Sequence, residues 1–137
     1  QDYWQLLAEG RDAVGEAQTL QWVMAALNSV AMVSVPWWFL EMTGATENGL
    51  NGWLESRLGH MERVLSEREW LVADRFTVAD LIMADVLRVP RVRRFGNRPA
   101  TESYVERVTG RAAFRKAHSD QMAHFTAADS ARRGAEA

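Results

Sequence analysis

The residues whose types could do chemistry are few, and the first of them is an amide in apolar surroundings. Asn28 lies within Thr19–Leu40, a stretch that contains no charged residue. Burying an amide without a hydrogen-bonding partner costs roughly 1–3 kcal/mol, so Asn28 needs one. A bound ligand is one candidate, and a backbone group or a water molecule is the other. Helical spacing places Met24, Leu27 and Ala31 near the face of Asn28.

No catalytic residue is predicted within this chain. The sequence contains no cysteine, which excludes disulfides, thiolate catalysis and zinc–thiolate sites here. Its histidines, His60, His118 and His124, lack the i, i+4 pairing of a helical zinc site, so no metal site is expected. No serine lies in the Gly-x-Ser-x-Gly surroundings of a hydrolase nucleophile.

One cluster of positive charge is present, formed by Arg88, Arg91, Arg93, Arg94 and Arg98. Such a cluster can contact nucleic acid or phosphate, or it can be a solvated loop. The net charge of −2 and the pI of about 5.9 favour the solvated loop, because no global field attracts nucleic acid. We therefore expect no nucleic-acid partner.

The spacing of apolar residues predicts the helices that must position these side chains. With 137 residues, 47% of them apolar and 25% charged, the chain fits one soluble globular domain. Apolar steps of three and four residues indicate an all-α bundle of about five helices. We expect them at residues 12–42 (with Asp12 as the cap), 50–67, 77–90, 99–110 and 113–125, followed by a frayed tail at 126–137.

The third helix has a distinct entrance. If Thr77 is its N-cap, the Thr77 hydroxyl can accept from the backbone of Asp80 while the Asp80 carboxylate accepts from the backbone N–H of Thr77, which is a capping box. Phe76 then lies over Leu81 as a hydrophobic staple. Beyond this entrance the helix has few polar faces, so we expect it to be central and buried.

Three stretches carry a family resemblance: EAQTLQWVMAALNSV (16–30), WLVADRFTVADLIMADVL (70–87) and RPATESYVERVTGRAAFRKA (98–117). In this order they resemble the all-α C-terminal domain of bacterial-type cytosolic glutathione S-transferases. The central stretch is similar to the segment Y/W-L-x-G-D-x-F-[ST]-x-A-D, which caps the buried sixth helix of that family. Ala73 replaces its frequent glycine, and Ala112 stands where the late pattern usually has proline. Neither departure touches the implied fold.

The resemblance spans about residues 12–125 and implies a detoxifying transferase that adds glutathione to small apolar electrophiles. It implies a cytoplasmic homodimer in which an N-terminal thioredoxin-like domain binds most of the glutathione, the co-substrate. Residues 1–11 resemble the end of the linker after that domain, so the chain is expected to be a fragment that is inactive alone. Matching the family's electrophile pocket to this sequence gives the substrate-binding residues Met24, Leu27, Asn28, Ala31 and Met32.

The uncharged stretch Thr19–Leu40 leaves two alternatives. It is long enough to cross a bilayer, but Gln21, Asn28, Ser34 and Pro36 and the absence of flanking basic clusters disfavour a membrane span. Five helices cannot surround this helix on all sides, so its excess apolar face predicts a neighbouring domain or subunit. Domains of this resemblance also serve as non-catalytic protein–protein docking modules, which is the alternative function.

Overall fold

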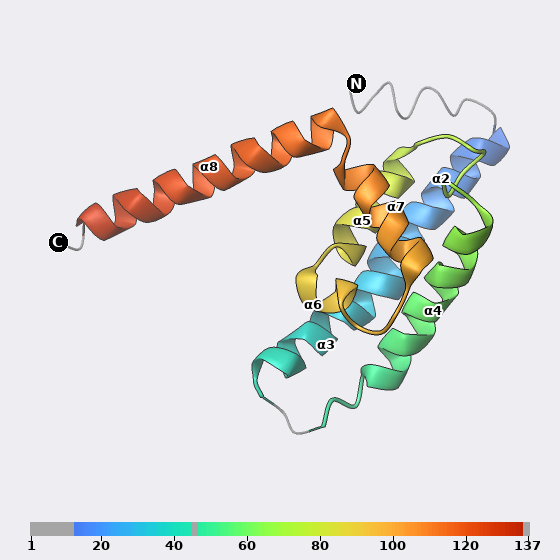
Figure 1. Ribbon diagram of the computed structural model, residues 1–137, viewed down its shortest axis with the longest axis horizontal. Helices are drawn as coiled ribbons and strands as arrows, with labels where there is room; N and C mark the ends of the chain where they lie inside the picture. Colours follow the sequence, from blue (N-terminus) through green and yellow to red (C-terminus); the bar gives the residue numbers. More distant parts are fainter. Residues whose placement is uncertain (1–12, 45–46, 136–137) are drawn as a thin grey trace.

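The computed structural model describes residues 13–44 and 47–135, and Figure 1 shows them as a bundle from which one long helix projects. Along the described chain the helices are α2 (Ala13–Ala25), the π-helix η1 (Ala26–Ala31), α3 (Met32–Met42), α4 (Asn51–Glu67), α5 (Val78–Leu87), α6 (Pro90–Arg93), α7 (Pro99–Thr109) and α8 (Ala112–Ala135). The predicted all-α fold is confirmed for these residues. Asp12, the expected cap, and residues 1–11, the expected linker, lie outside them.

The core forms around α5, as expected for its nearly all-apolar sequence. This helix packs against α2 and η1 on one side and against α7 on the other, while α4 packs against α7 and α3. The fully buried large side chains come from α4, α5, α7 and the loop before α5: Leu54, Leu58, Met61, Leu71, Val72, Asp80, Met83, Leu87, Tyr104, Val105 and Val108. Their interdigitation fixes the bundle to which the long first helix is attached.

The long first helix is continuous through α2, η1 and α3, in agreement with the expected span to about residue 42. Its inner side buries Ala26, Val30, Val33 and Trp37 against the bundle. By length and composition Val14–Met42 could cross a membrane. In this structure its inner side belongs to the core of the bundle, while most of its residues are not buried.

Start and stop signals in the sequence lie at the ends of several helices. Pro99 occupies the first turn of α7, where its missing N–H costs no hydrogen bond. Gly44, just beyond α3, has a φ of +69°, a left-handed conformation that glycine adopts without strain. The short helix α6, which begins at Pro90, was not predicted from the sequence.

The last helix differs from the expected one. Instead of ending near Phe125 in a frayed tail, α8 continues to Ala135. Four alanines between Thr126 and the end of α8 favour the helix, and Arg132 and Arg133 in its last turn complement the helix dipole. No residue of α8 is buried, and Figure 1 shows it pointing away from the bundle.

Candidate functional site

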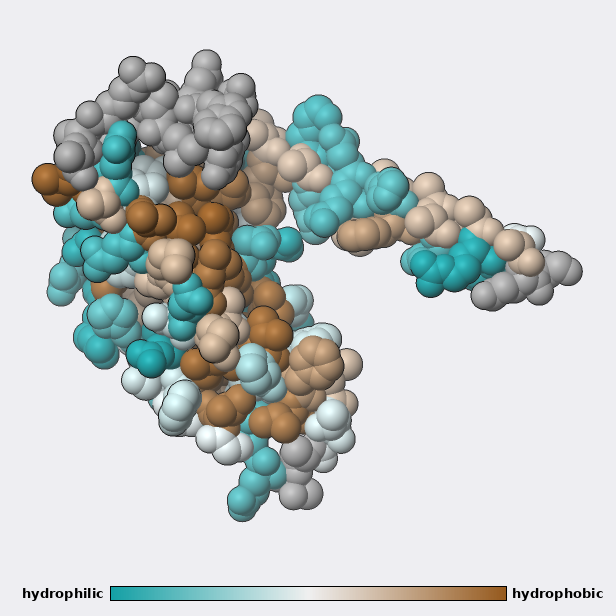
Figure 2. Space-filling view, turned by 180° about the vertical axis from the view of Figure 1, so that it is seen from behind, coloured by the Kyte–Doolittle hydropathy of each residue, from teal (hydrophilic) through white to brown (hydrophobic). Residues whose placement is uncertain are grey.

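A continuous apolar surface runs along the outer side of the first helix. We call it the α2–α3 stripe, and it consists of Leu20, Met24, Leu27, Met32, Val35, Phe39 and Met42. Every member is exposed, from 46% for Leu27 to 64% for Met32. The members follow one another at steps that average one helical turn, so they share one side of the helix. Figure 2 shows this side as a band of apolar side chains along the body.

The sequence-derived substrate-binding residues lie on or beside this stripe. Met24, Leu27, Asn28 and Met32 are exposed, and Ala31 is half-buried. The Asn28 Nδ2 atom lies 3.8 Å from the Met24 Sδ atom, a weak contact. The premise that the Asn28 amide is buried in apolar surroundings is therefore wrong, since solvent reaches it. The face itself forms an open surface rather than a closed pocket.

The π-helix η1 lies under the middle of this surface and contains Leu27, Asn28 and Ala31. Nothing in the sequence pattern predicted it, because apolar periodicity does not distinguish a π-turn from α-turns. Short π-helical segments within α-helices are frequent at functional sites. The presence of η1 at this position favours the middle of the stripe as the place where a ligand or partner binds.

A buried polar network holds α5, the helix behind the stripe. Thr77 and Asp80 form a capping box at the start of α5, with the Thr77 N–H donating to the Asp80 Oδ2 atom at 2.8 Å. The Asp80 Oδ1 atom also accepts from the Leu71 N–H at 3.0 Å and from the Tyr104 hydroxyl at 3.0 Å. The sequence predicted the box but not Leu71 or Tyr104, because both partners are distant in the chain.

The electrostatics of this network follow from its burial. Burial raises the pKa of the Asp80 carboxyl above its usual value, although the hydrogen bonds from Leu71, Thr77 and Tyr104 lower it. Burial and the neighbouring Asp80 carboxylate raise the pKa of the Tyr104 hydroxyl, so Tyr104 acts as a hydrogen-bond donor. The network therefore has a structural role rather than a role in acid–base catalysis.

The far end of the stripe is anchored by a second polar network that the sequence did not reveal. The Trp37 Nε1 atom donates to the Asn51 Oδ1 atom at 2.7 Å, and the Asn48 Nδ2 atom donates to the Trp37 carbonyl at 3.0 Å. Trp37 is buried and meets Phe95 edge-on at 5.2 Å, whereas Trp38 is half-buried. Of the two tryptophans, Trp37 thus fills the core and joins the end of α3 to α4.

The arginine cluster is largely paired with carboxylates. Arg88 binds Asp85 at 2.7 Å, Arg98 binds Glu55 at 3.0 Å, and Arg93 binds Glu102. The hydrogen bond from Arg93 lowers the pKa of the Glu102 carboxyl. The Arg93 and Arg98 pairs tie α6 and the following loop to α7 and α4, whereas the Arg88–Asp85 pair lies within the C-terminal end of α5. This pairing favours the interpretation of the cluster as part of the scaffold.

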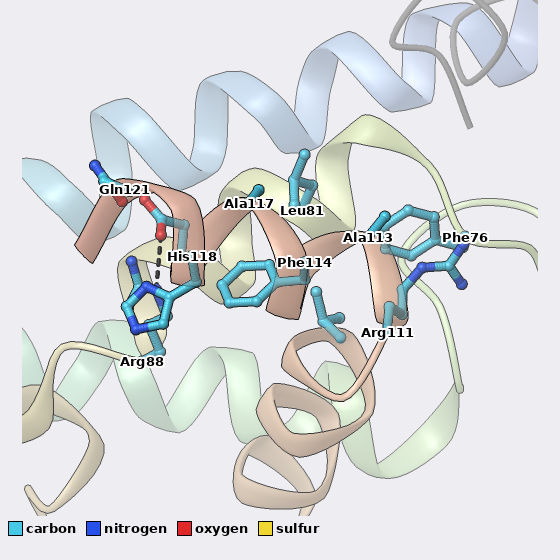
Figure 3. Close-up of a pocket in the computed structure, with 11 residues that line it drawn as sticks. Phe76, Leu81, Arg88, Arg111, Ala113, Phe114, Ala117, His118 and Gln121 are labelled. Carbon is cyan, nitrogen blue, oxygen red and sulfur yellow. Dashed lines mark hydrogen bonds and ion pairs between the residues drawn. The ribbon is translucent and has the colours of Figure 1, made fainter. Parts of the chain in front are cut away.

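A groove of about 500 Å³ lies elsewhere, between α5, the end of α7 and the start of α8. None of the five sequence-derived substrate-binding residues lines it; its walls include Phe76, Leu81, Phe114 and Ala117. Figure 3 shows Leu81 of α5 opposite these α8 side chains. Phe76 and Leu81, the expected staple pair, line this groove together, and Phe76 also meets Trp70 edge-on at 5.4 Å.

Comparison with known families adds one match. Residues 50–112 match the family described as "Glutathione S-transferase, C-terminal domain". A search of curated proteins finds no match to this chain. The family match covers α4, α5, α6 and α7, which form the scaffold behind the α2–α3 stripe.

Proposed function

The chain carries a glutathione S-transferase C-terminal domain, and on that premise we propose that it forms the electrophile-binding half of a glutathione S-transferase. The observation that carries the proposal is the α2–α3 stripe, an exposed apolar surface on a helix whose other side is fixed in the core. Such a surface suits small apolar electrophiles, and Met24, Leu27, Asn28, Ala31 and Met32 are the residues that would contact them.

The chemistry divides between two domains. Glutathione, the co-substrate, would be bound and its thiol deprotonated by a thioredoxin-like domain outside the residues of this chain. Its thiolate would attack an electrophilic carbon, forming a carbon–sulfur bond while the leaving group departs. The contribution of the stripe would be to hold the electrophile in line with that attack, which raises the rate through proximity. The 137-residue chain alone is then expected to conjugate nothing.

The same surface accounts for the expected partners. An apolar stripe of this length on an otherwise ordinary protein surface suits contact with another domain or subunit. We propose that part of it is covered by the thioredoxin-like domain and that the protein is a cytoplasmic homodimer. The sequence contains no cysteine, which is compatible with a reducing cytoplasm.

A matched pair of substitutions tests the proposal in the natural protein from its source. Met24 in the stripe and Met122 on α8 are 50% and 49% exposed. With 1-chloro-2,4-dinitrobenzene as the electrophile, Met24→Gln is expected to raise its KM roughly fivefold, about 1 kcal/mol of lost apolar contact. The KM for glutathione should stay unchanged, and Met122→Gln should change neither constant. Equal effects of the two substitutions would contradict the proposal.

The alternative is a helical docking module without catalytic activity, in which the stripe binds a protein partner. The exposed stripe favours it as well, because aromatic and methionine side chains are common at protein interfaces. The intact mass and N-terminal sequence of the natural protein separate the two. A mass close to 15.5 kDa would support the docking module, whereas an additional thioredoxin-like domain would support the transferase.

A further inference from the structure

Helix α8 presents a second apolar surface, distinct from the α2–α3 stripe. Phe114, His118 and Phe125 follow at steps of four and seven residues, so they lie on one side of the helix. Met122 flanks this line and is 49% exposed, and Phe125 is 52% exposed. The surface begins in the groove between α5 and α8 and continues along α8 beyond it. We call it the α8 face.

The part of the α8 face inside the groove is held in place by stacked side chains. The Arg88 guanidinium lies over the Phe114 ring at 5.4 Å, and the His118 ring stacks beside Phe114 at 6.3 Å. At the other end of the groove the Arg111 guanidinium lies over Phe76 at 3.8 Å. Figure 3 shows Phe114 between these two ends, with Ala117 and Leu81 forming the apolar middle. The groove is therefore a preformed apolar trough, with the Arg88–Asp85 ion pair at one end and Arg111 at the other.

The charge of this region is opposite to that of the rest of the chain. Residues 111–135 contain five basic residues, Arg111, Arg115, Lys116, Arg132 and Arg133, and two acidic ones, Asp120 and Asp129, for a net charge of +3. Because the whole chain has a net charge of −2, the remainder has −5. Arg132 follows Phe114 by 18 residues, five whole turns, so it returns to the same side as Phe114 at the far end.

A small molecule would fill the groove but leave the rest of the α8 face uncovered. An isolated helix has marginal stability in water, and α8 buries none of its residues. A partner that runs along α8 would cover both the groove and the exposed side chains Met122 and Phe125. Its surface should be apolar where it meets Phe114 and acidic where it meets the arginines.

We propose that the α8 face is a docking surface for an acidic amphipathic helix of a partner protein, whose apolar side chains enter the groove between α5 and α8. This is the helix-in-groove mode of recognition, in which anchors at helical spacing fill an apolar trough. Carboxylates on either side of those anchors would face the net positive charge of residues 111–135. The inference is independent of the proposed transferase activity, because it uses neither the α2–α3 stripe nor glutathione.

Two synthetic helices with the same leucine spacing test the proposal on the full 137-residue chain. One carries glutamate at its polar positions and the other carries lysine. Fluorescence anisotropy at low salt is expected to show the glutamate peptide binding at least about tenfold more tightly, with the difference shrinking as salt is added. Equal binding of the two peptides, or no binding of the glutamate peptide, would overturn the proposal.

Variants locate the binding surface. Ala117 is exposed on α8 and lines the groove, so Ala117→Trp fills the groove without disturbing the core. It is expected to weaken binding of the glutamate peptide roughly tenfold, as is the double substitution of Met122→Gln with Phe125→Ser. Met24→Gln on the α2–α3 stripe should leave binding unchanged. Loss of binding in Met24→Gln but not in Ala117→Trp would show that the peptide binds the α2–α3 stripe rather than the α8 face. That result would overturn the inference.

Self-association is the remaining competitor, because the acidic remainder of a second copy could also cover α8. Sedimentation of the Met122→Gln, Phe125→Ser chain distinguishes it. The proposal expects the same oligomeric state as in the unsubstituted chain. Dissociation of an oligomer in this variant would mean that a second copy, rather than an acidic partner helix, occupies the α8 face.

Discussion

Four hydrogen bonds converge on the buried Asp80 carboxylate. It accepts from the backbone N–H groups of Leu71 and Thr77 and from the hydroxyls of Thr77 and Tyr104. These donors belong to a loop, a helix start and a second helix, so one carboxylate joins three parts of the fold. Asp80 therefore fixes the positions of these three segments relative to one another through its hydrogen bonds.

Removing the carboxylate should therefore be costly. Asp80→Ala leaves buried donors without acceptors, and we expect it to lower the free energy of unfolding by about 3–5 kcal/mol. Asp80→Asn keeps one acceptor oxygen and should cost about half as much. Urea denaturation measures both. Asp85→Asn is the control, since the Asp85 side chain is 58% exposed. An Asp80→Ala chain as stable as the control would contradict this account.

The loop before α5 contains a strained residue. Ala73 and Asp74 have φ angles of +49° and +52°, the left-handed conformation, and the Arg75 N–H closes the turn onto the Val72 carbonyl at 3.2 Å. Aspartate tolerates this conformation better than alanine does. The structure thus gives the physical reason why glycine is frequent at the position of Ala73 in the resembling family, a departure already visible in the sequence.

Ala73→Gly should relieve this strain. We expect the free energy of unfolding to rise by about 0.5–1 kcal/mol, because the gain in the folded turn exceeds the added entropy of the unfolded chain. Ala73→Val should lower it, since a β-branched side chain fits the left-handed region poorly. Thermal or urea unfolding of the two variants checks the sign. Stabilisation by valine would show that the turn is not strained at this residue.

Contacts between helices account for features that single side chains do not explain. Glu62 of α4 accepts from the N–H groups of Ala100 and Thr101 at 2.9 and 2.8 Å, and from the Thr101 hydroxyl at 2.8 Å. It therefore caps the start of α7 from another helix, as a carboxylate at a helix N-terminus does. The sequence does not predict this cap, because the contact joins residues far apart in the chain.

The Glu62 contact makes a pH-dependent contribution to stability. Burial opposes the shift, but the hydrogen bonds from Thr101 and Ala100 lower the pKa of the Glu62 carboxyl below its usual value. The contribution is therefore present above the usual carboxyl pKa and is lost as the pH falls through the lowered one. Glu62→Gln should cost about 1 kcal/mol at pH 7 and progressively less in acid.

Unfolding curves of Glu62→Gln and of the unsubstituted chain, recorded from pH 7 down to pH 3, measure that difference. Glu67→Gln, at the exposed end of the same helix, is the control. A difference between Glu62→Gln and the unsubstituted chain that grows as the pH falls would reverse the sign and contradict the capping role.

What the sequence could predict depends on how local each signal is. The capping box of α5, Pro99 at the start of α7 and the apolar periodicity of α4 act within a few residues, so they predicted these helices well. The Tyr104–Asp80 bond and the cap from Glu62 depend on packing between distant segments. The π-helix η1 was missed because apolar periodicity does not distinguish a π-turn from α-turns. The substrate-binding residues came from the resemblance, and the structure places them on an open surface.

The part of the chain that the structure describes presents two exposed apolar surfaces at different places. The α2–α3 stripe lies on the bundle, and the α8 face begins at its edge and continues along the projecting helix. If α8 is independent of the bundle, removing residues 122–135 should change the free energy of unfolding by less than about 0.5 kcal/mol. Circular dichroism should show the lost helix. A loss above about 2 kcal/mol would mean that α8 packs onto the bundle in solution.

The π-helix also determines where the first helix can lose a residue without disturbing the core. A π-turn accommodates one more residue than an α-turn within a continuous helix. Losing one residue within Ala26–Ala31 would leave a plain α-helix, with Thr19 and Trp37 still turned toward the core. Losing one residue within α3 ahead of Trp37 would instead rotate Trp37 by about 100° and carry it out of its contact with Phe95. Deletions in this helix should therefore be tolerated in η1 and rejected on either side of it.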